Sequence, residues 1–211
     1  MSTQLLLVSE APTLPGQALT AARAWAGTIA PDWVAARQLY TALDGSSVLE
    51  LMALPDMANL ALLDSWWAHC LQATRPYLQG DMCRQVLRFV EAPKDCATPL
   101  PRTRYIQLRH VEVRPPVHEA YLAWREQTIF QVVREASEVE TFLAYHSLIS
   151  SEPGVMFVSG FSGSLAAYSA VFGSPAYQDI VRQAGNRFIT GGERGLYTKL
   201  YQDISQPEPQ P

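Results

Sequence analysis

The sequence predicts an α+β protein built from two βαββαβ units in tandem. The same order of apolar runs and helical stripes occurs in the first ninety or so residues and again from residue 104. Residues 92–103 separate the two units, because their three prolines and lack of apolar periodicity are typical of a linker. The segments PYLQGD (76–81) and RFITGG (187–192) also resemble each other, each shortly before the last strand of its unit. We therefore predict an internal duplication with domains at 1–91 and 104–204, a linker at 92–103 and a disordered tail at 205–211.

The first unit is defined by short apolar runs and one clear helical stripe. The continuous apolar run in residues 4–9 predicts a strand that is buried on both faces. Between Pro15 and Ala30 the apolar residues recur every three or four positions, which predicts a helix with one apolar face. Asp44-Gly45 between two apolar runs is typical of a hairpin turn. The predicted elements are strands at 4–9, 34–43, 48–54 and 82–90 and helices at 15–30 and 57–72.

The second unit repeats this order with stronger patterns. Helical spacing of apolar residues predicts one long helix over 117–135, after the Pro115-Pro116 break. Ser162 or Ser164 is expected to cap a short helix that ends at residue 171, and Ser174-Pro175 to open the next one. The predicted strands are 104–113, 139–149, 155–161 and 196–204, and the last helix is 176–186.

Composition argues against several classes of function. A formal charge of −4 and a pI of about 5.6 provide no basic surface for nucleic acid. The sequence has neither an apolar run of about 20 residues, as a membrane span requires, nor the basic start of a signal peptide. Cys70, Cys83 and Cys96 fit neither a disulfide framework nor a zinc site, so we expect free thiols, no metal and a cytoplasmic location.

The second unit resembles a subunit of the dimeric α/β-barrel superfamily, whose members have a ferredoxin-like fold. The resemblance lies in YLAWREQTIFQVVREA (121–136), YHSLIS (145–150), VMFVSGFS (155–162), SLAAYSAVFGSPAYQDIV (164–181) and YTKLYQDI (197–204). It covers residues 104–204 well and 3–91 weakly. The resemblance implies two four-stranded antiparallel sheets, each with its helices on one face, packed face to face as an intramolecular barrel.

Candidate site residues are expected in the second unit, between the sheet and its helices. His110 and His146 are the candidate catalytic residues, because a buried histidine can act as a general base or bind a metal. The candidate ligand-binding residues are aromatic: Tyr121, Trp124, Phe142, Phe157, Tyr168 and Tyr177. The alternative interpretation is that these aromatic side chains only form a core.

Two basic residues of the second unit are expected to face the barrel interior. Arg109 and Lys199 lie on strands, and a buried cation requires an acidic partner, which Glu50 or Glu112 could provide. The first unit contributes Trp25, Tyr40, Trp66, Trp67 and His69 and is interpreted mainly as the partner that covers the second sheet.

Three functions remain open from the sequence. The resemblance implies a small-molecule-binding protein, as a cofactor-independent monooxygenase or isomerase acting on a small aromatic or quinone-like substrate. It also implies an alternative, a haem protein of the chlorite-dismutase-like type with His110 or His146 as the proximal ligand. The third alternative is a non-catalytic ligand-binding or structural protein, so whether the chain is an enzyme stays open. A second copy could also pair with open sheet edges to form a homodimer.

Overall fold

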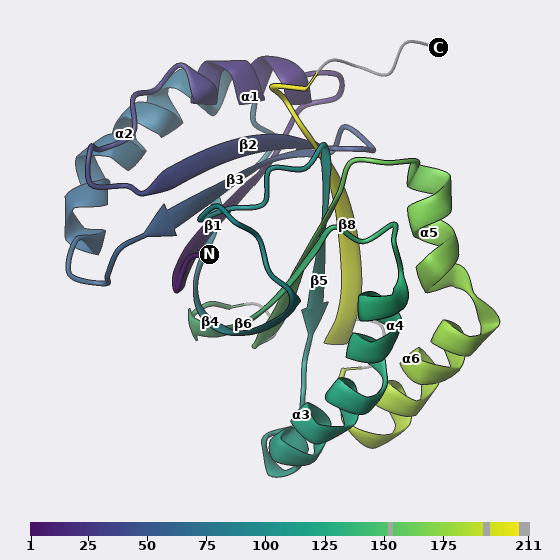
Figure 1. Cartoon of the computed structure of the whole chain (residues 1–211). Coiled ribbons are helices and arrows are strands. Elements are labelled where there is room, and N and C mark those ends of the chain that lie inside the picture. The colour runs from purple at the N-terminus through teal and green to yellow at the C-terminus, as the bar shows by residue number, and fades with distance from the viewer. Residues whose placement is uncertain (152–153, 192–194, 207–211) are drawn as a thin grey trace.

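The strands of this computed structural model close into one antiparallel barrel (Figure 1). The structure describes residues 1–151, 154–191 and 195–206. Within them the order around the barrel is β1-β3-β2-β8-β5-β7-β6-β4. The strands are β1 (Leu5–Pro12), β2 (Ala36–Ala42), β3 (Ser47–Leu54), β4 (Cys83–Lys94), β5 (Tyr105–Val111), β6 (Thr141–Ile149), β7 (Val155–Phe161) and β8 (Leu196–Asp203).

The two halves of the barrel have the same internal strand order. The N-terminal half runs β4-β1-β3-β2 and the C-terminal half runs β8-β5-β7-β6, so each has the arrangement of a ferredoxin-like unit. The halves join along two seams, β2–β8 and β4–β6. The predicted fold class is therefore confirmed, while an origin by duplication stays a prediction.

Helices cover the outer face of each half of the barrel (Figure 1). They are α1 (Ala18–Ala26) and α2 (Leu63–Thr74) in the first half, and α3 (His118–Gln127), α4 (Ile129–Glu135), α5 (Leu165–Gly173) and α6 (Pro175–Arg187) in the second. Short 3-10 segments lie at Leu60–Leu62, Arg75–Tyr77 and Pro115–Val117. Ser164 caps α5 and Ser174 caps α6, each by accepting a backbone N–H bond three residues on.

The predicted element boundaries differ from the structure in several places, among them the helix predicted over 57–72, which begins only at Leu63. The long helix expected over 117–135 is two helices, because the backbone at Thr128 (φ −129°, ψ −81°) leaves the helical region. The first helix begins only at Ala18, after a turn in which Gly16 has a φ of +73°. β4 continues to Lys94, into the predicted linker. Parts of the predicted turn at 150–154, of the loop before β8 and of the tail (152–153, 192–194 and 207–211) lie outside the described residues.

Alternating side chains divide the core into three layers. One cluster fills the barrel interior, and one lies between sheet and helices in each half. The rest of the linker, from residue 95, crosses one end of the barrel, where Cys96 and Leu100 join the interior cluster. The linker therefore also closes one end of the barrel interior.

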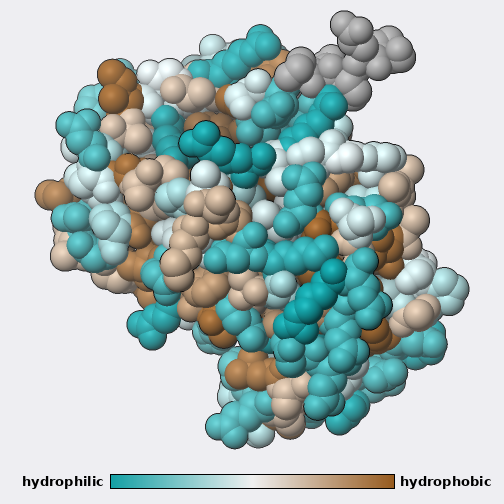
Figure 2. Space-filling view, in the orientation of Figure 1, coloured by the Kyte–Doolittle hydropathy of each residue, from teal (hydrophilic) through white to brown (hydrophobic). Residues whose placement is uncertain are grey.

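The surface mixes polar and apolar residues. Figure 2 shows hydrophobic residues scattered among hydrophilic ones on the face it presents. Ile29, Leu62 and Ile149, among the most exposed apolar side chains, come from separate parts of the chain. In the described part of the chain, the structure contains no helix with the length and apolar character that a membrane crossing requires.

Candidate functional site

The six predicted aromatic residues lie together in the helix–sheet layer of the C-terminal half. All belong to one buried cluster, in which the ring centroids of Phe142 and Phe157 are 5.1 Å apart. A cavity between Arg109, Tyr121, Phe157 and Tyr177 has a volume of only about 20 Å³. That volume accommodates about one water molecule. The layer is thus closely packed, and a ligand role for its aromatic residues stays a prediction.

The two predicted catalytic histidines lie apart from this layer and from each other. His110 faces the barrel interior, is 3% exposed and stacks on Tyr197 with ring centroids 4.5 Å apart. His146 is exposed near the end of β6, with its ring centroid 5.4 Å from that of His118. Burial first, and then the nearby His146 and Arg125, lower the pKa of His118. A catalytic role for either predicted histidine stays a prediction.

The expected environment of Arg109 is wrong, and so is the expected partner of Lys199. Arg109 faces the helices, where it donates a hydrogen bond to the Tyr177 hydroxyl. Strand alternation places it on the face opposite His110. Lys199 pairs with Glu10 at 2.8 Å, near the barrel end opposite the linker. Burial would raise the pKa of Glu10, but hydrogen bonds from Lys199, Ser47 and Tyr201 outweigh it, so the pKa is lowered.

The N-terminal half contains a row of buried polar residues that the sequence interpretation missed. Ser9 on β1 lies directly opposite Glu50 on β3 and Arg84 on β4, so the three side chains share the helix-covered face. Arg37 on β2 donates from Nε to Glu50 Oε1 at 2.5 Å. Its other guanidinium nitrogens bind the carbonyl oxygens of Trp25 and Thr28, at the end of α1. Three strands and one helix therefore position the Glu50 carboxylate.

Several polar atoms in this layer have no hydrogen-bond partner among the described residues. They are Glu50 Oε2, Ser9 Oγ, Arg84 Nε and the indole nitrogens of Trp25, Trp66 and Trp67. Leaving a buried donor or acceptor unpaired costs about 1–3 kcal/mol. In the C-terminal half, Tyr168 is hydrogen-bonded to Ser159 Oγ at 2.9 Å and Gln107 Oε1 at 3.2 Å, whereas Tyr121 Oη and Thr141 Oγ1 also have no partner among the described residues. The N-terminal layer thus has the unpaired groups that a polar ligand could satisfy.

Glu50 is poised to exchange a proton at neutral pH. Its side chain is fully buried, and burial raises its pKa to about 7, although Arg37 and Arg84 oppose this shift. Arg37 lies over the ring of Trp66 and Arg84 over that of Trp67, at 5.2 and 4.6 Å from the ring centroids. Carboxylate, cations and aromatic rings therefore surround one small region.

A surface hollow adjoins this layer. Its volume is about 240 Å³, and its lining includes Trp67, Arg84 and Asp81. Trp67 and Arg84 belong both to the hollow and to the polar layer, and the charge of Arg84 acts on Glu50. The hollow therefore shares two residues with this layer, whereas Glu50 itself, 0% exposed, does not line it.

One sequence signal could have identified this site. Glu50 interrupts the apolar strand VLELMAL, and period-two alternation places it with Val48 and Met52 on a buried face. A carboxylate on such a buried face requires charged or hydrogen-bonding partners, and it is therefore a candidate functional residue. The partners Arg37 and Arg84 come from other strands, so they carry no comparable local signal. No group of three or more metal-binding side chains occurs in the described part of the chain.

Comparisons with known proteins show the fold of this chain. The sequence matches no protein-family model and no curated protein. Among solved structures, an anthrone oxidase-like protein matches with a TM-score of 0.70 and 12% identity, over 94% of this chain and 90% of that one. A candidate chlorite dismutase matches with a TM-score of 0.65 and 13% identity, over 95% of each chain. A candidate monooxygenase from Fusobacterium nucleatum matches with a TM-score of 0.64 and 10% identity, over 96% of this chain and 93% of that one. Identities this low establish the ferredoxin-like, dimeric α/β-barrel fold alone.

Proposed function

We propose that this protein binds a small aromatic or quinone-like molecule and acts on it as a cofactor-independent monooxygenase or isomerase, with Glu50 as the proton acceptor. The observation that carries the proposal is the buried Glu50 carboxyl, which has one oxygen held by Arg37 and the other unpaired among the described residues. The monooxygenase-like and anthrone oxidase-like proteins that share its fold support it further.

The first step is removal of a proton from an acidic hydroxyl or an enolisable C–H of the substrate. We place the aromatic ring in the hollow against Trp67 and assign the proton to Glu50 Oε2, which belongs to the buried layer beside Arg84 and does not itself line the hollow. The resulting anion is stabilised by the Arg84 guanidinium and by the Ser9 hydroxyl, which need no reorganisation because the strands hold them in a row.

The second step differs between the oxygenase reaction and the isomerase reaction. In the oxygenase reaction the substrate anion reacts with dioxygen, so that a ring CH₂ and one O₂ become a carbonyl and one water. In the isomerase reaction Glu50 returns the proton to a different carbon of the same anion. Both courses need the same carboxyl and no cofactor.

The haem alternative receives no support from the residues predicted to bind the iron. A proximal histidine must face a cavity that accommodates a porphyrin. His110 is packed in the barrel interior and His146 projects from an exposed strand end, and neither lines the hollow or the cavity beside Tyr177. An absorbance scan of the purified protein for a Soret band tests this alternative directly.

Oxygen consumption with anthrone as the probe tests the proposal. We expect the wild-type protein to consume oxygen, and Glu50→Gln to lower the rate by about 100-fold, the lower range for a general base. The rate should rise with pH through about pH 7, where Glu50 loses its proton. Glu91→Gln is the matched control, since Glu91 also pairs with a buried arginine, Arg125, in the other half.

Two results would contradict the proposal. The first is a wild-type protein that neither consumes oxygen nor changes its tryptophan fluorescence with anthrone. The second is an equal loss of rate in Glu50→Gln and Glu91→Gln, which would assign the effect to lost ion pairs rather than to proton transfer.

A further inference from the structure

The two seams between the halves of the barrel are unequal. Along β4–β6 the pairing extends from Val86 opposite Ile149 to Lys94 opposite Phe142. Along β2–β8 it is limited to three positions, from Tyr40 to Ala42 on β2. Just beyond β8, the Ile204 backbone N–H donates to the Leu39 carbonyl, so residues 36–38 are the part of β2 with no segment paired to that edge within the described residues.

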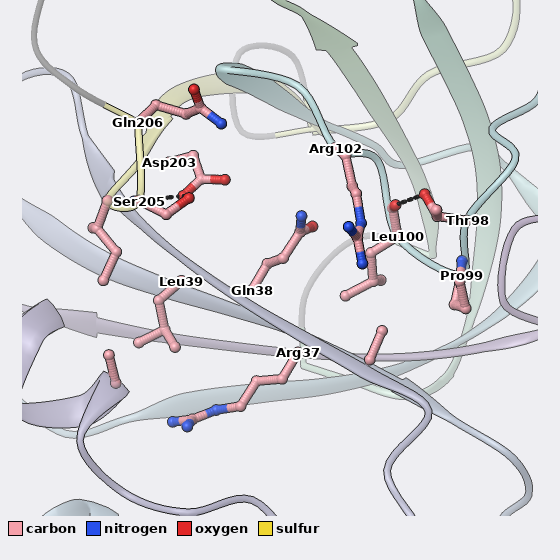
Figure 3. A pocket seen from close by; sticks show the side chains of 13 residues that line it. Arg37, Gln38, Leu39, Thr98, Pro99, Leu100, Arg102, Asp203, Ser205 and Gln206 are labelled. Carbon is pink, nitrogen blue, oxygen red and sulfur yellow. Dashed lines mark hydrogen bonds between the residues drawn. The ribbon is translucent and has the colours of Figure 1, made fainter.

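A groove lies along this unpaired part of β2 (Figure 3). Its volume is about 500 Å³, and its walls come from the end of α1, from β2, from the linker and from the segment after β8. The volume falls within the range of about 300–1,000 Å³ that is usual for small-molecule sites. Arg37 is among the lining residues, but its guanidinium points away from the groove in Figure 3 and pairs with Glu50, which lies outside the lining.

One wall of the groove carries unpaired hydrogen-bond donors. Arg102 extends from the linker, is exposed, and makes no hydrogen bond or ion pair with any residue that the structure describes. The side chain of Gln38 points into the same space (Figure 3). Its carbonyl oxygen accepts a bond from the Tyr40 hydroxyl at 2.8 Å, which leaves its NH₂ group available to a ligand.

The opposite wall carries an acceptor, and apolar side chains lie between the two. Asp203 Oδ1 accepts bonds from the backbone nitrogen and the hydroxyl of Ser205, at 2.8 and 2.7 Å. Both bonds use the same oxygen, so Oδ2 remains as an acceptor. Leu39 and Leu100 contribute apolar surface to the lining.

We propose that the groove binds a small organic acid that carries a hydroxyl or amino group at its other end. The carboxylate binds the Arg102 guanidinium, whose planar fork matches it, and the NH₂ group of Gln38. The donor at the other end binds Asp203 Oδ2, and the apolar body of the ligand packs on Leu39 and Leu100. This is a second ligand site, which does not depend on the reaction assigned to Glu50.

A titration of the ¹⁵N-labelled full chain with 3-(4-hydroxyphenyl)propanoate, followed by NMR, tests the proposal. We expect saturable shifts of the Gln38 side-chain amide. Arg102→Gln should weaken binding about tenfold or more, as expected for loss of a charge-assisted hydrogen bond. Arg75→Gln, a change of an exposed arginine just after α2, should leave it unaltered. The amide of the probe, which lacks the charge, should bind more weakly than the acid.

The acceptor wall is tested with the same readout. Asp203→Asn should weaken binding of the hydroxylated probe more than binding of 3-phenylpropanoate. If this variant fails to fold, the affinities of the two probes for the wild-type chain are compared instead. The proposal is overturned if millimolar probe leaves the Gln38 amide unshifted, or if acid and amide bind equally. It is also overturned if Arg102→Gln has no effect, or if the hydroxyl adds nothing to the affinity for the wild-type chain.

Discussion

The buried charged residues of the two halves of the barrel differ in how fully they are paired. Arg125, 1% exposed, pairs with Glu91 and lies over the rings of Tyr121 and Phe157. Glu50 pairs with Arg37 but keeps one oxygen unpaired among the described residues. Burial of charge is costly even when it is paired. An acidic residue kept in that state is typical of a functional site rather than of a core optimised for stability.

The titration of Glu50 should be visible in the stability of the protein. Its pKa is about 7 in the folded chain, against an ordinary value of 4.5, so the folded state binds the proton more tightly than the unfolded state. The stabilisation is therefore complete below about pH 4.5 and is lost as the pH rises through 7. We expect the unfolding free energy of the wild type to fall by about 3 kcal/mol relative to Glu50→Gln across this range.

Urea unfolding of both proteins between pH 5 and pH 8 measures this difference. Other carboxylates, such as Glu10 with its lowered pKa, titrate equally in both proteins and cancel. A difference that does not vary with pH would show that Glu50 remains ionised throughout and is not a proton acceptor near neutrality.

At the level of single elements, local sequence signals account for most helix starts in the second half. The serines expected to begin helices do so at α5 and α6, because a serine hydroxyl satisfies free backbone N–H groups in any tertiary context. The division of the 117–135 helix was not predicted. Thr128 Oγ1 donates to the Trp124 carbonyl at 2.7 Å, and apolar spacing continues through the break, so periodicity gives no warning of it.

Removal of the α6 cap should have a modest and local effect. Ser174 Oγ accepts from the Tyr177 backbone nitrogen and donates to the Val171 carbonyl, so it joins α5 to α6. We expect Ser174→Ala to lower the free energy of unfolding by about 1 kcal/mol, as measured by urea titration. Ser169→Ala, an exposed change within α5, is the control and should be nearly neutral. An equal effect of the two changes would mean that the cap does not stabilise α6.

At the level of the whole molecule, the barrel makes the two halves interdependent. Strands of one half pair with strands of the other along both seams, and the linker places Leu100, 2% exposed, in the shared interior. Residues 92–103 were predicted only as a linker, and their burial was not predicted, since three prolines without periodicity carry no signal for burial. The domain boundaries at 91 and 104 and the homodimer stay predictions.

Unfolding should therefore be a single cooperative transition. Four of the five tryptophans, Trp25, Trp33, Trp66 and Trp67, lie in the N-terminal half, so fluorescence reports mainly on that half, whereas far-ultraviolet circular dichroism reports on both halves. We expect the two probes to give coincident curves in urea. Leu100→Ala should shift both midpoints together, with a loss of about 2–5 kcal/mol, the usual range for a buried leucine. Separate transitions would show that the halves fold as independent domains.

The sequence by itself determined the order of the elements and the two faces of each strand. Both follow from local periodicity, which depends only on neighbours along the chain. It also marked the aromatic residues that form the C-terminal layer.

Only the tertiary structure decided which face of β5 turns toward the barrel interior. That choice separates His110 from the aromatic layer and places Arg109 within this layer. It alone also assembled Ser9, Glu50 and Arg84, because strand register brings together residues that are far apart in the chain. Register and closure depend on how all the apolar faces are buried at once, and no local stretch of sequence contains that information.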